Sequence, residues 1–139
     1  MCSSDLLGIG QLEKLDRILA ARRQVAERYA SLLGGLDLEL PIPDDADHVR
    51  SWFVYVVKLP AGVDRDAVIG RMAERGVACA PYVPSIHLQS YMRERFGFTE
   101  GLCPVSEDVS RRTMALPFHA RLAADDQDYV AESLRFCLG

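Results

Sequence analysis

The chain has 139 residues, of which 49% are hydrophobic and 26% charged, and these values are typical of one globular domain. The net charge of −4 argues against nucleic-acid binding, because contacts to phosphates need clustered lysine and arginine. No apolar run approaches the roughly 20 residues that span a bilayer, and no segment has the form of a signal peptide. The four cysteines are widely spaced and form no CxxC pair, so we expect free thiols, as in a cytoplasmic protein. We also expect no contact with a membrane or with nucleic acid.

The first part of the chain is dominated by one periodic segment. Apolar residues recur at steps of three and four from Ile9 to Leu33, which predicts one long amphipathic helix. Gly34-Gly35 follows, and glycine is expected to end the helix in the left-handed conformation. Residues 36–40 are a candidate short strand, and the proline- and aspartate-rich residues 41–47 are expected to form a loop.

Strands and helices alternate in the rest of the chain. Aromatic and β-branched residues predict a first strand, Asp64 is suited to cap the helix that follows it, and Pro104 suits the first turn of another helix. The expected order is a strand at 51–58, a helix at 65–75, a strand at 77–82, a short helix at 88–95, a helix at 104–112, a strand at 113–117 and a helix at 125–137.

This order predicts an α+β fold, in which a long first helix is followed by a small three-stranded sheet with helices packed on one face. The connections alone do not fix the strand directions, and we expect an antiparallel sheet. No internal repeat or low-complexity tract divides the chain.

A self-contained active site is not recognisable in the residues. The sequence has no GxSxG, P-loop, HExxH or GxGxxG motif. His48, His87 and His119 lie far apart in sequence, and each is a candidate for an ordinary structural histidine. The acidic residues of 44–47 lack the glycine and the distal glutamate of an EF-hand, so we expect a solvated loop there and no metal site.

Five segments, taken in order, resemble the C-terminal part of DegT/DnrJ/StrS-type aminotransferases. They read GIGQLEKLDRILAARRQVAERYASLL (8–33), SWFVYVVKLP (51–60), DRDAVIGRMAERGV (64–77), PYVPSIHLQSYM (81–92) and PVSEDVSRRTMALPFHARLAADDQDYVAESLR (104–135). The IHLQ and LPFH stretches are the more specific ones. The resemblance implies that residues 8–139 are the small domain of such an enzyme, and that the large domain, which binds pyridoxal 5′-phosphate (PLP), is absent.

The resemblance implies a fold-type-I enzyme that transfers an amino group, usually from glutamate, to a keto group on a nucleotide-linked sugar. PLP would act as the electron sink, and the parent enzyme would be a cytoplasmic homodimer in amino-sugar, polysaccharide or antibiotic-sugar biosynthesis. The family's Schiff-base lysine lies in the large domain, and neither Lys14 nor Lys58 matches its segment. We therefore expect no catalytic residue, no bound cofactor and no activity in this chain alone.

His87 is the residue to which the resemblance gives a role. It matches the histidine that faces the active-site cleft and helps to seat the sugar nucleotide, where an imidazole can hydrogen-bond a hydroxyl or phosphate oxygen. Tyr82 is a second candidate for binding substrate, with simple packing as the alternative. Trp52 and Tyr55 are expected to pack in the core or at a domain interface, and His119 is expected to hold a turn.

The chain departs from the family's pattern at its start. Residues 1–7 replace a polar segment, and their Cys-Ser-Ser-Asp-Leu is one translation of a common sequencing-adapter string, so we expect a non-native or truncated start. Ala123 stands where the last helix usually has a serine or threonine N-cap, which should cost about 1 kcal/mol. Leu102-Cys103 stands in place of an expected Gly-Asp pair.

Two other functions stay open at this point. A PLP-dependent sugar dehydratase of the same superfamily has a histidine in place of the catalytic lysine, at a position that this sequence does not contain. A non-catalytic α+β ligand-binding module would be a stable monomer with its own pocket. The small domain of an enzyme should instead expose an apolar face where the large domain docks.

Overall fold

A computed structural model of the chain describes residues 3–139. Its elements are α1 (Ser3–Leu12), α2 (Leu15–Leu33), β1 (Tyr55–Lys58), α3 (Arg65–Glu74), β2 (Ala80–Pro81), the 3-10 helix η1 (Ile86–Leu88), α4 (Ser90–Phe96), α5 (Pro104–Arg112), β3 (Thr113–Leu116) and α6 (Ala124–Leu138). The described part of the chain is thus an α+β fold with a long N-terminal helical region, as expected.

The three strands form one sheet in the order β1-β3-β2, and both pairings are antiparallel. The central strand β3 pairs with β1 over its whole length, from Tyr55 opposite Leu116 to Lys58 opposite Thr113. Ala80, in β2, lies opposite Ala115 on the other edge of β3. The expected antiparallel sheet is confirmed.

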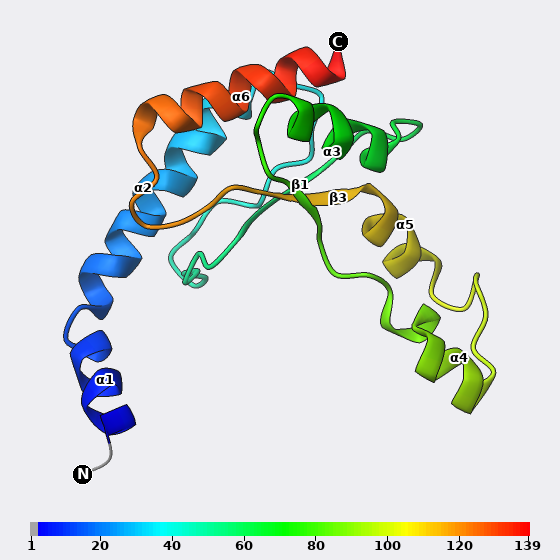
Figure 1. Cartoon of the computed structure of the whole chain (residues 1–139), viewed down its shortest axis with the longest axis horizontal. Helices are drawn as coiled ribbons and strands as arrows, with labels where there is room; N and C mark the ends of the chain where they lie inside the picture. The colour runs from blue at the N-terminus through cyan, green and yellow to red at the C-terminus, as the bar shows by residue number, and fades with distance from the viewer. Residues whose placement is uncertain (1–2) are drawn as a thin grey trace.

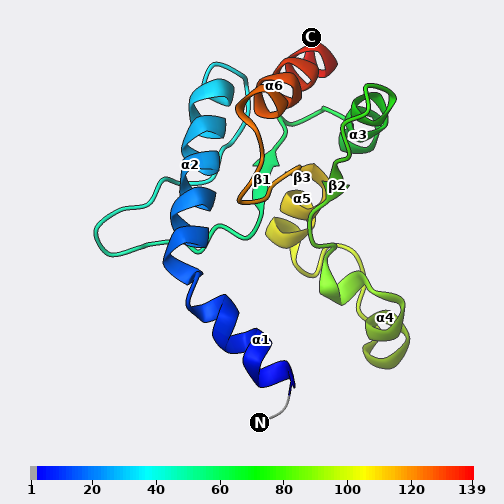
Figure 2. The ribbon, with the colours of Figure 1, turned by 60° about the vertical axis from the view of Figure 1, so that its left-hand side comes forward.

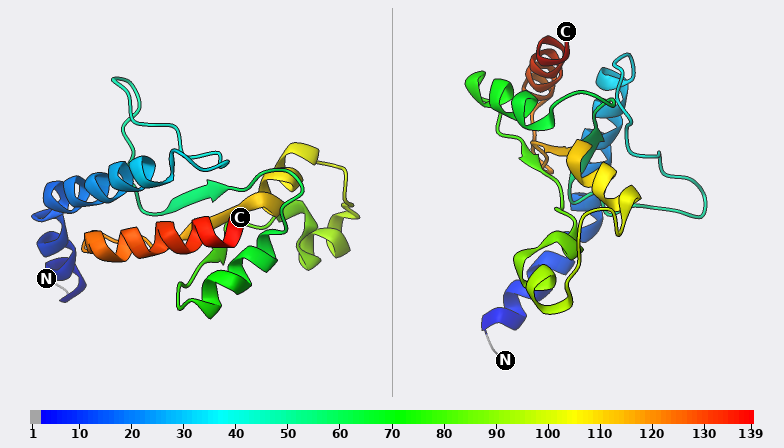
Figure 3. Two further views of the ribbon diagram at one scale, coloured as in Figure 1. Left: turned by 90° about the horizontal axis from the view of Figure 1, so that it is seen from above. Right: turned by 90° about the vertical axis from the view of Figure 1, so that its right-hand side faces the viewer.

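The core lies between one face of this sheet and the three helices α2, α3 and α6 (Figure 1, Figure 2). Because successive side chains of a strand point to opposite faces, alternate residues of β1 and their partners in β3 point toward these helices. The helices α2 and α6 lie side by side (Figure 3) and contribute most of the remaining core. The largest fully buried side chains include Tyr29, Leu33, Tyr55, Val57, Met72, Met114 and Leu134.

The predicted single helix from Ile9 to Leu33 is wrong at one point, because a turn at Glu13 and Lys14 separates α1 from α2. The apolar side chains of α1 do not reach the core: Ile9 and Leu12 are both exposed. In Figure 1, α1 projects away from the sheet. Helix stability in proteins comes mostly from packing an apolar face, so the exposed Ile9 and Leu12 do not hold α1 in line with α2.

The strands are shorter than the sequence predicts, because β3 has only four residues to pair with. The strand expected at 51–58 begins at Tyr55, and the one expected at 77–82 is reduced to Ala80–Pro81, where the proline lacks an N–H to extend the ladder. Residues 36–40 form only an isolated bridge between Glu39 and Lys58.

Helix ends follow the sequence more closely. The Asp64 carboxylate accepts the N–H groups of Asp66 at 2.9 Å and Ala67 at 3.2 Å, so the predicted N-cap of α3 is confirmed. The helix α5 begins at Pro104, and α6 begins after Ala123, whose side chain makes no cap hydrogen bond. Gly34 ends α2 with φ −62°, so the left-handed conformation expected there is wrong.

Candidate functional site

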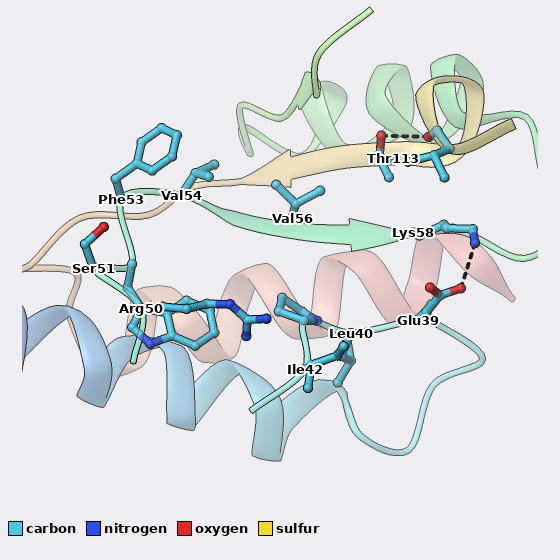
Figure 4. A pocket seen from close by; sticks show the side chains of 13 residues that line it. Glu39, Leu40, Ile42, Arg50, Ser51, Phe53, Val54, Val56, Lys58 and Thr113 are labelled. Atoms are coloured by element: carbon cyan, nitrogen blue, oxygen red, sulfur yellow. Dashed lines mark hydrogen bonds and ion pairs between the residues drawn. The ribbon is translucent and has the colours of Figure 1, made fainter. Parts of the chain in front are cut away.

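The sheet face that points away from α2, α3 and α6 is open. Val56 and Thr113 lie on this face, because they alternate with the buried Val57 and Met114. A cavity of about 600 Å³ lies over it, and Figure 4 shows Val54, Val56 and Thr113 lining one side of it. The other lining residues are Glu39, Leu40, Pro41, Ile42, Arg50, Ser51, Trp52, Phe53, Lys58 and Val109.

A second cavity, of about 900 Å³, continues this surface toward α5. The two cavities share Val56, Val109 and Thr113, so they form one continuous hollow. Tyr82, which follows β2, is half-buried and lines the second cavity. We call this surface the open face; its residues are Val54, Val56, Tyr82, Val83, Val105, Val109 and Thr113, with Ile42 and Phe53 at its rim.

Two residues bordering the open face have strained backbones. Trp52 has φ 48° and Val83 has φ 46°, and within residues 3–139 they are the only non-glycine residues with positive φ. A bulky or β-branched side chain is rarely found in this region, where the strain is of order 1–3 kcal/mol per residue. Such strain is concentrated at functional sites in proteins, so both positions favour this surface as the candidate site.

An ordinary surface helix turns its apolar side toward the core and its polar side toward water. In α5 the two sides are reversed. Val105 is 77% exposed on the open face, and Val109, one turn later, is also exposed. Glu107 is only 3% exposed. This arrangement leaves an apolar stripe without a partner in the described chain.

The buried side of α5 holds residues 82–103, which we call the arm and which include η1 and α4. Ser85 donates its N–H to Ser110 Oγ at 3.1 Å and its hydroxyl to the Ser106 carbonyl at 3.2 Å. The Thr113 hydroxyl, at the end of α5, is 3.2 Å from the Tyr82 carbonyl. The first residues of the arm are therefore fixed to α5 by polar contacts, and α4 extends away from the sheet (Figure 1).

His87 lies within η1 and is buried against Glu107, with its Nε2 atom 2.8 Å from Oε1 of the carboxylate. The same carboxylate accepts the N–H of Gly101 at 2.9 Å and that of Cys103 at 3.1 Å. The Gly101 N–H, the His87 imidazole and the Cys103 N–H all favour the ionised form and hold the pKa of Glu107 below its usual range.

The two candidate residues that the sequence named for the substrate are thus placed differently. Tyr82 lines the second cavity, whereas His87 lines neither cavity of the open face and is bonded to Glu107. Sequence reasoning missed Glu107. The spacing gave little signal, because Glu107 lies four residues after the N-cap Cys103, one position beyond the spacing of a capping box, although its carboxylate accepts the Cys103 N–H.

Other residues named from the sequence are found in structural roles. Tyr55 is fully buried and stacks on Trp52 at 5.9 Å between ring centroids, so packing is confirmed for both. Nδ1 of His119 accepts the N–H of Arg121 at 3.2 Å, which confirms that His119 holds a turn. His48 is exposed and contacts Asp45 in its own loop.

The residues of this chain do not fit a PLP site. The cofactor needs a lysine whose amine is free to form an imine. Lys14 is exposed in the turn between α1 and α2 and lines neither cavity of the open face, and Lys58 is ion-paired with Glu39 at 2.8 Å. Among residues 7–139, whose side chains the structure describes, there is no cluster of three or more histidine, cysteine, aspartate or glutamate side chains that could hold a metal ion. None of the described helices is long and apolar enough to cross a bilayer.

A small sheet that helices cover on one face only, with an apolar open face on the other side, is typical of a domain that packs against a second domain. The sequence model of the DegT/DnrJ/EryC1/StrS aminotransferase family matches residues 4–135. The chain belongs to this family, as its sequence segments indicated.

Solved structures of several aminotransferases are similar to the chain. The aminotransferase TlmJ from Streptoalloteichus hindustanus is 33% identical, with a TM-score of 0.82, over 94% of this chain and 34% of its own. A DegT/DnrJ/EryC1/StrS aminotransferase from Brucella abortus is 26% identical, with a TM-score of 0.77, over 92% of this chain and 33% of its own. The sugar aminotransferase CalS13 from Micromonospora echinospora is 25% identical, with a TM-score of 0.78, over 93% of this chain and 33% of its own. The chain therefore spans about a third of the length of these relatives.

Proposed function

We propose that residues 8–139 act as the small domain of a PLP-dependent sugar aminotransferase, and that the open face docks on a large domain that carries the cofactor. The complete enzyme would be a homodimer that transfers an amino group from glutamate to a keto group of a nucleotide-linked sugar. In this proposal PLP supplies the electron sink and the large domain supplies the lysine. Residues of this chain close the site and contact the sugar nucleotide.

The reversed helix α5 is the single observation that carries the proposal. A helix on the free surface of a protein turns its polar side to water, but α5 exposes Val105 and Val109 and buries Glu107. Exposed apolar surface that continues over two cavities marks a contact with another protein surface. This chain spans about a third of the length of the solved relatives, and the remaining two thirds of their length could supply that surface.

Within the docked enzyme, the residues of this chain would exclude water and orient the substrate. Val56, Val105 and Val109 would be covered by the large domain, which removes water from one side of the site. Tyr82 has a hydroxyl that can hydrogen-bond a sugar or phosphate oxygen from the wall of the second cavity. His87 would contribute from the arm, in the orientation that its bond to Glu107 gives it.

The experiment is a chimera in which residues 8–139 replace the matching third of the Streptoalloteichus aminotransferase, the relative with 33% identity. Amino transfer from glutamate to a nucleotide-linked keto sugar is measured. We expect activity in the chimera and a loss of at least about tenfold on Val105→Asp, because docking would bury an unpaired carboxylate. The 139-residue chain with Val105→Asp should stay folded, because an aspartate is favourable in the first turn of α5.

The control is Phe136→Asp, which also places a carboxylate at an exposed apolar position but on α6, on the covered side of the sheet. This chimera should keep its activity. Full activity of the Val105→Asp chimera would show that α5 is not the docking surface. A wild-type chimera that folds, binds PLP and transfers no amino group would contradict the proposed function and would favour a non-catalytic binding module.

A further inference from the structure

Glu107 is the only buried carboxylate among residues 7–139, whose side chains the structure describes. Burying an ionised carboxylate is costly unless hydrogen bonds replace its water. Here the replacement comes from widely separated residues: His87, twenty positions earlier, and Gly101 and Cys103 at the end of the arm. One side chain therefore joins the beginning of the arm, its end and α5.

Apolar packing does not hold the arm in place. Four of its large apolar side chains, Ile86, Tyr91, Phe96 and Leu102, are exposed, and the half-buried Leu88, Met92 and Phe98 are not among the side chains packed against the core. The η1 and α4 elements contact each other, whereas no contact of comparable extent joins α4 to the described sheet or to α2, α3 or α6. The position of the arm depends on polar contacts with α5, and the Glu107 carboxylate receives three of them.

The contacts also fix the state of the histidine. An ionised carboxylate only accepts hydrogen bonds, so Nε2 of His87 must carry a proton to bond Oε1 at 2.8 Å. A carboxylate partner of this kind sets the tautomer and the ring orientation of a histidine. Gly101 has φ 91°, a conformation that glycine adopts without strain, and its N–H donates to the same carboxylate.

We propose that Glu107 is a positioning residue that closes the arm by binding His87, Gly101 and Cys103, and that it thereby sets the orientation of the segment that meets the sugar nucleotide. The last clause rests on the function proposed above, whereas the closure of the arm does not. Glu107 itself touches neither substrate nor cofactor in this proposal. We call the contacts of Glu107 with His87, Gly101 and Cys103 the clasp. A variant that loses the clasp should change substrate affinity more than the rate of the chemical step.

The first test uses the 139-residue chain and follows hydrogen–deuterium exchange of individual amides by NMR. Glu107→Gln keeps the size of the side chain but replaces one carboxylate oxygen, which accepts hydrogen bonds, with an NH₂ group, which donates them. This NH₂ group would then face N–H donors of the arm. We expect the amides of Gly101 and Cys103 to exchange about tenfold faster or more, and the ¹⁵N signal of the protonated Nε2 of His87 to be lost. Amides of β1 and β3 should keep their protection.

The matched control is Asp108→Asn, which removes a carboxylate at the next position of α5, where it pairs only with Arg112. It should leave Gly101, Cys103 and the His87 signal unchanged. If Glu107→Gln does not fold, His87→Gln removes a single contact of the clasp and should loosen η1 while Gly101 and Cys103 stay protected. Unchanged exchange at Gly101 and Cys103 in Glu107→Gln, or an equal loss of protection throughout the sheet, would overturn the clasp.

The second test uses the chimera described above. Glu107→Gln should raise KM for the sugar nucleotide by about tenfold while kcat changes much less, and Asp108→Asn should change neither. A fall in kcat of about tenfold with an unchanged KM would refute the positioning role. If the wild-type chimera is inactive, the proposed function fails, but the exchange data on the 139-residue chain still decide whether Glu107 holds the arm.

Discussion

Two buried tyrosines in the core offer a direct test of how hydrogen bonding contributes to this fold. Tyr29 of α2 and Tyr55 of β1 pack with ring centroids 5.1 Å apart, and both are at most 1% exposed. The Tyr29 hydroxyl donates to the Pro117 carbonyl at 2.9 Å. The Tyr55 hydroxyl is buried as well, but it has no hydrogen-bond partner among the described residues.

Removing each hydroxyl should therefore have opposite consequences. Tyr29→Phe loses a hydrogen bond and leaves the Pro117 carbonyl without its donor, which should lower the free energy of unfolding by about 1–2 kcal/mol. Tyr55→Phe removes a polar group whose burial is not compensated, so the free energy of unfolding should stay the same or rise by up to about 1 kcal/mol. The two variants should differ by about 2 kcal/mol although each loses one oxygen atom.

The assay is chemical denaturation of the 139-residue chain and of both single variants, followed by the double variant because the rings are in contact. Equal m-values would show that the four proteins unfold between comparable states. A loss in Tyr55→Phe as large as that in Tyr29→Phe would refute the reasoning. It would mean that the Tyr55 hydroxyl has a bonded partner, such as an ordered water molecule.

Three further predictions concern pH, glycine positions and helix capping. Burial raises the pKa of Tyr55 from 10.0 to about 12, so the unfolded chain loses this proton at a lower pH than the folded chain. The free energy of unfolding should therefore be independent of Tyr55 below pH 10 and should fall between about pH 10 and 12. Denaturation at each pH should show a less steep fall in Tyr55→Phe. Gly76→Ala forces alanine into φ 77° and should lower the free energy of unfolding by about 1 kcal/mol. Gly70→Ala lies inside α3 with open space around it and should raise the free energy of unfolding by about 0.5–1 kcal/mol. Equal changes of the two variants in thermal unfolding would contradict both predictions. Ala123→Ser adds the missing N-cap of α6 and should raise the free energy of unfolding by about 1 kcal/mol, with Ala124→Ser as a control that should not.

The elements that the sequence predicted best are those whose signals are local. Asp64 identifies the start of α3 and Pro104 that of α5, because capping and the missing proline N–H act within one turn. The break at Glu13 and Lys14 could not be predicted in this way. The apolar pattern continues through it, and only the absence of a packing partner for Ile9 and Leu12 separates α1 from α2. Strand lengths were also out of reach, because they depend on what β3 offers for pairing.

The candidate site was predictable only in part, for a related reason. Tyr82 and His87 could be named from the segments that resemble the family, but the partner of His87 could not. In a helix with valine at 105 and 109 and glutamate between them, periodicity would place the valines inside and Glu107 outside. The structure has the opposite arrangement, because the arm returns to α5 at Gly101 and Cys103 and brings N–H donors to the carboxylate.

The clasp and the open face are two consequences of one helix. Since α5 uses Ser106, Glu107 and Ser110 to bind the arm, its apolar residues are left to face outward over the sheet. A domain that functioned alone would gain by turning α5 round, which would bury Val105 and expose Glu107. The arrangement is advantageous only if another surface covers the valines. Holding the arm and docking the open face therefore use different sides of one helix, so Glu107→Gln tests the first role and Val105→Asp tests the second.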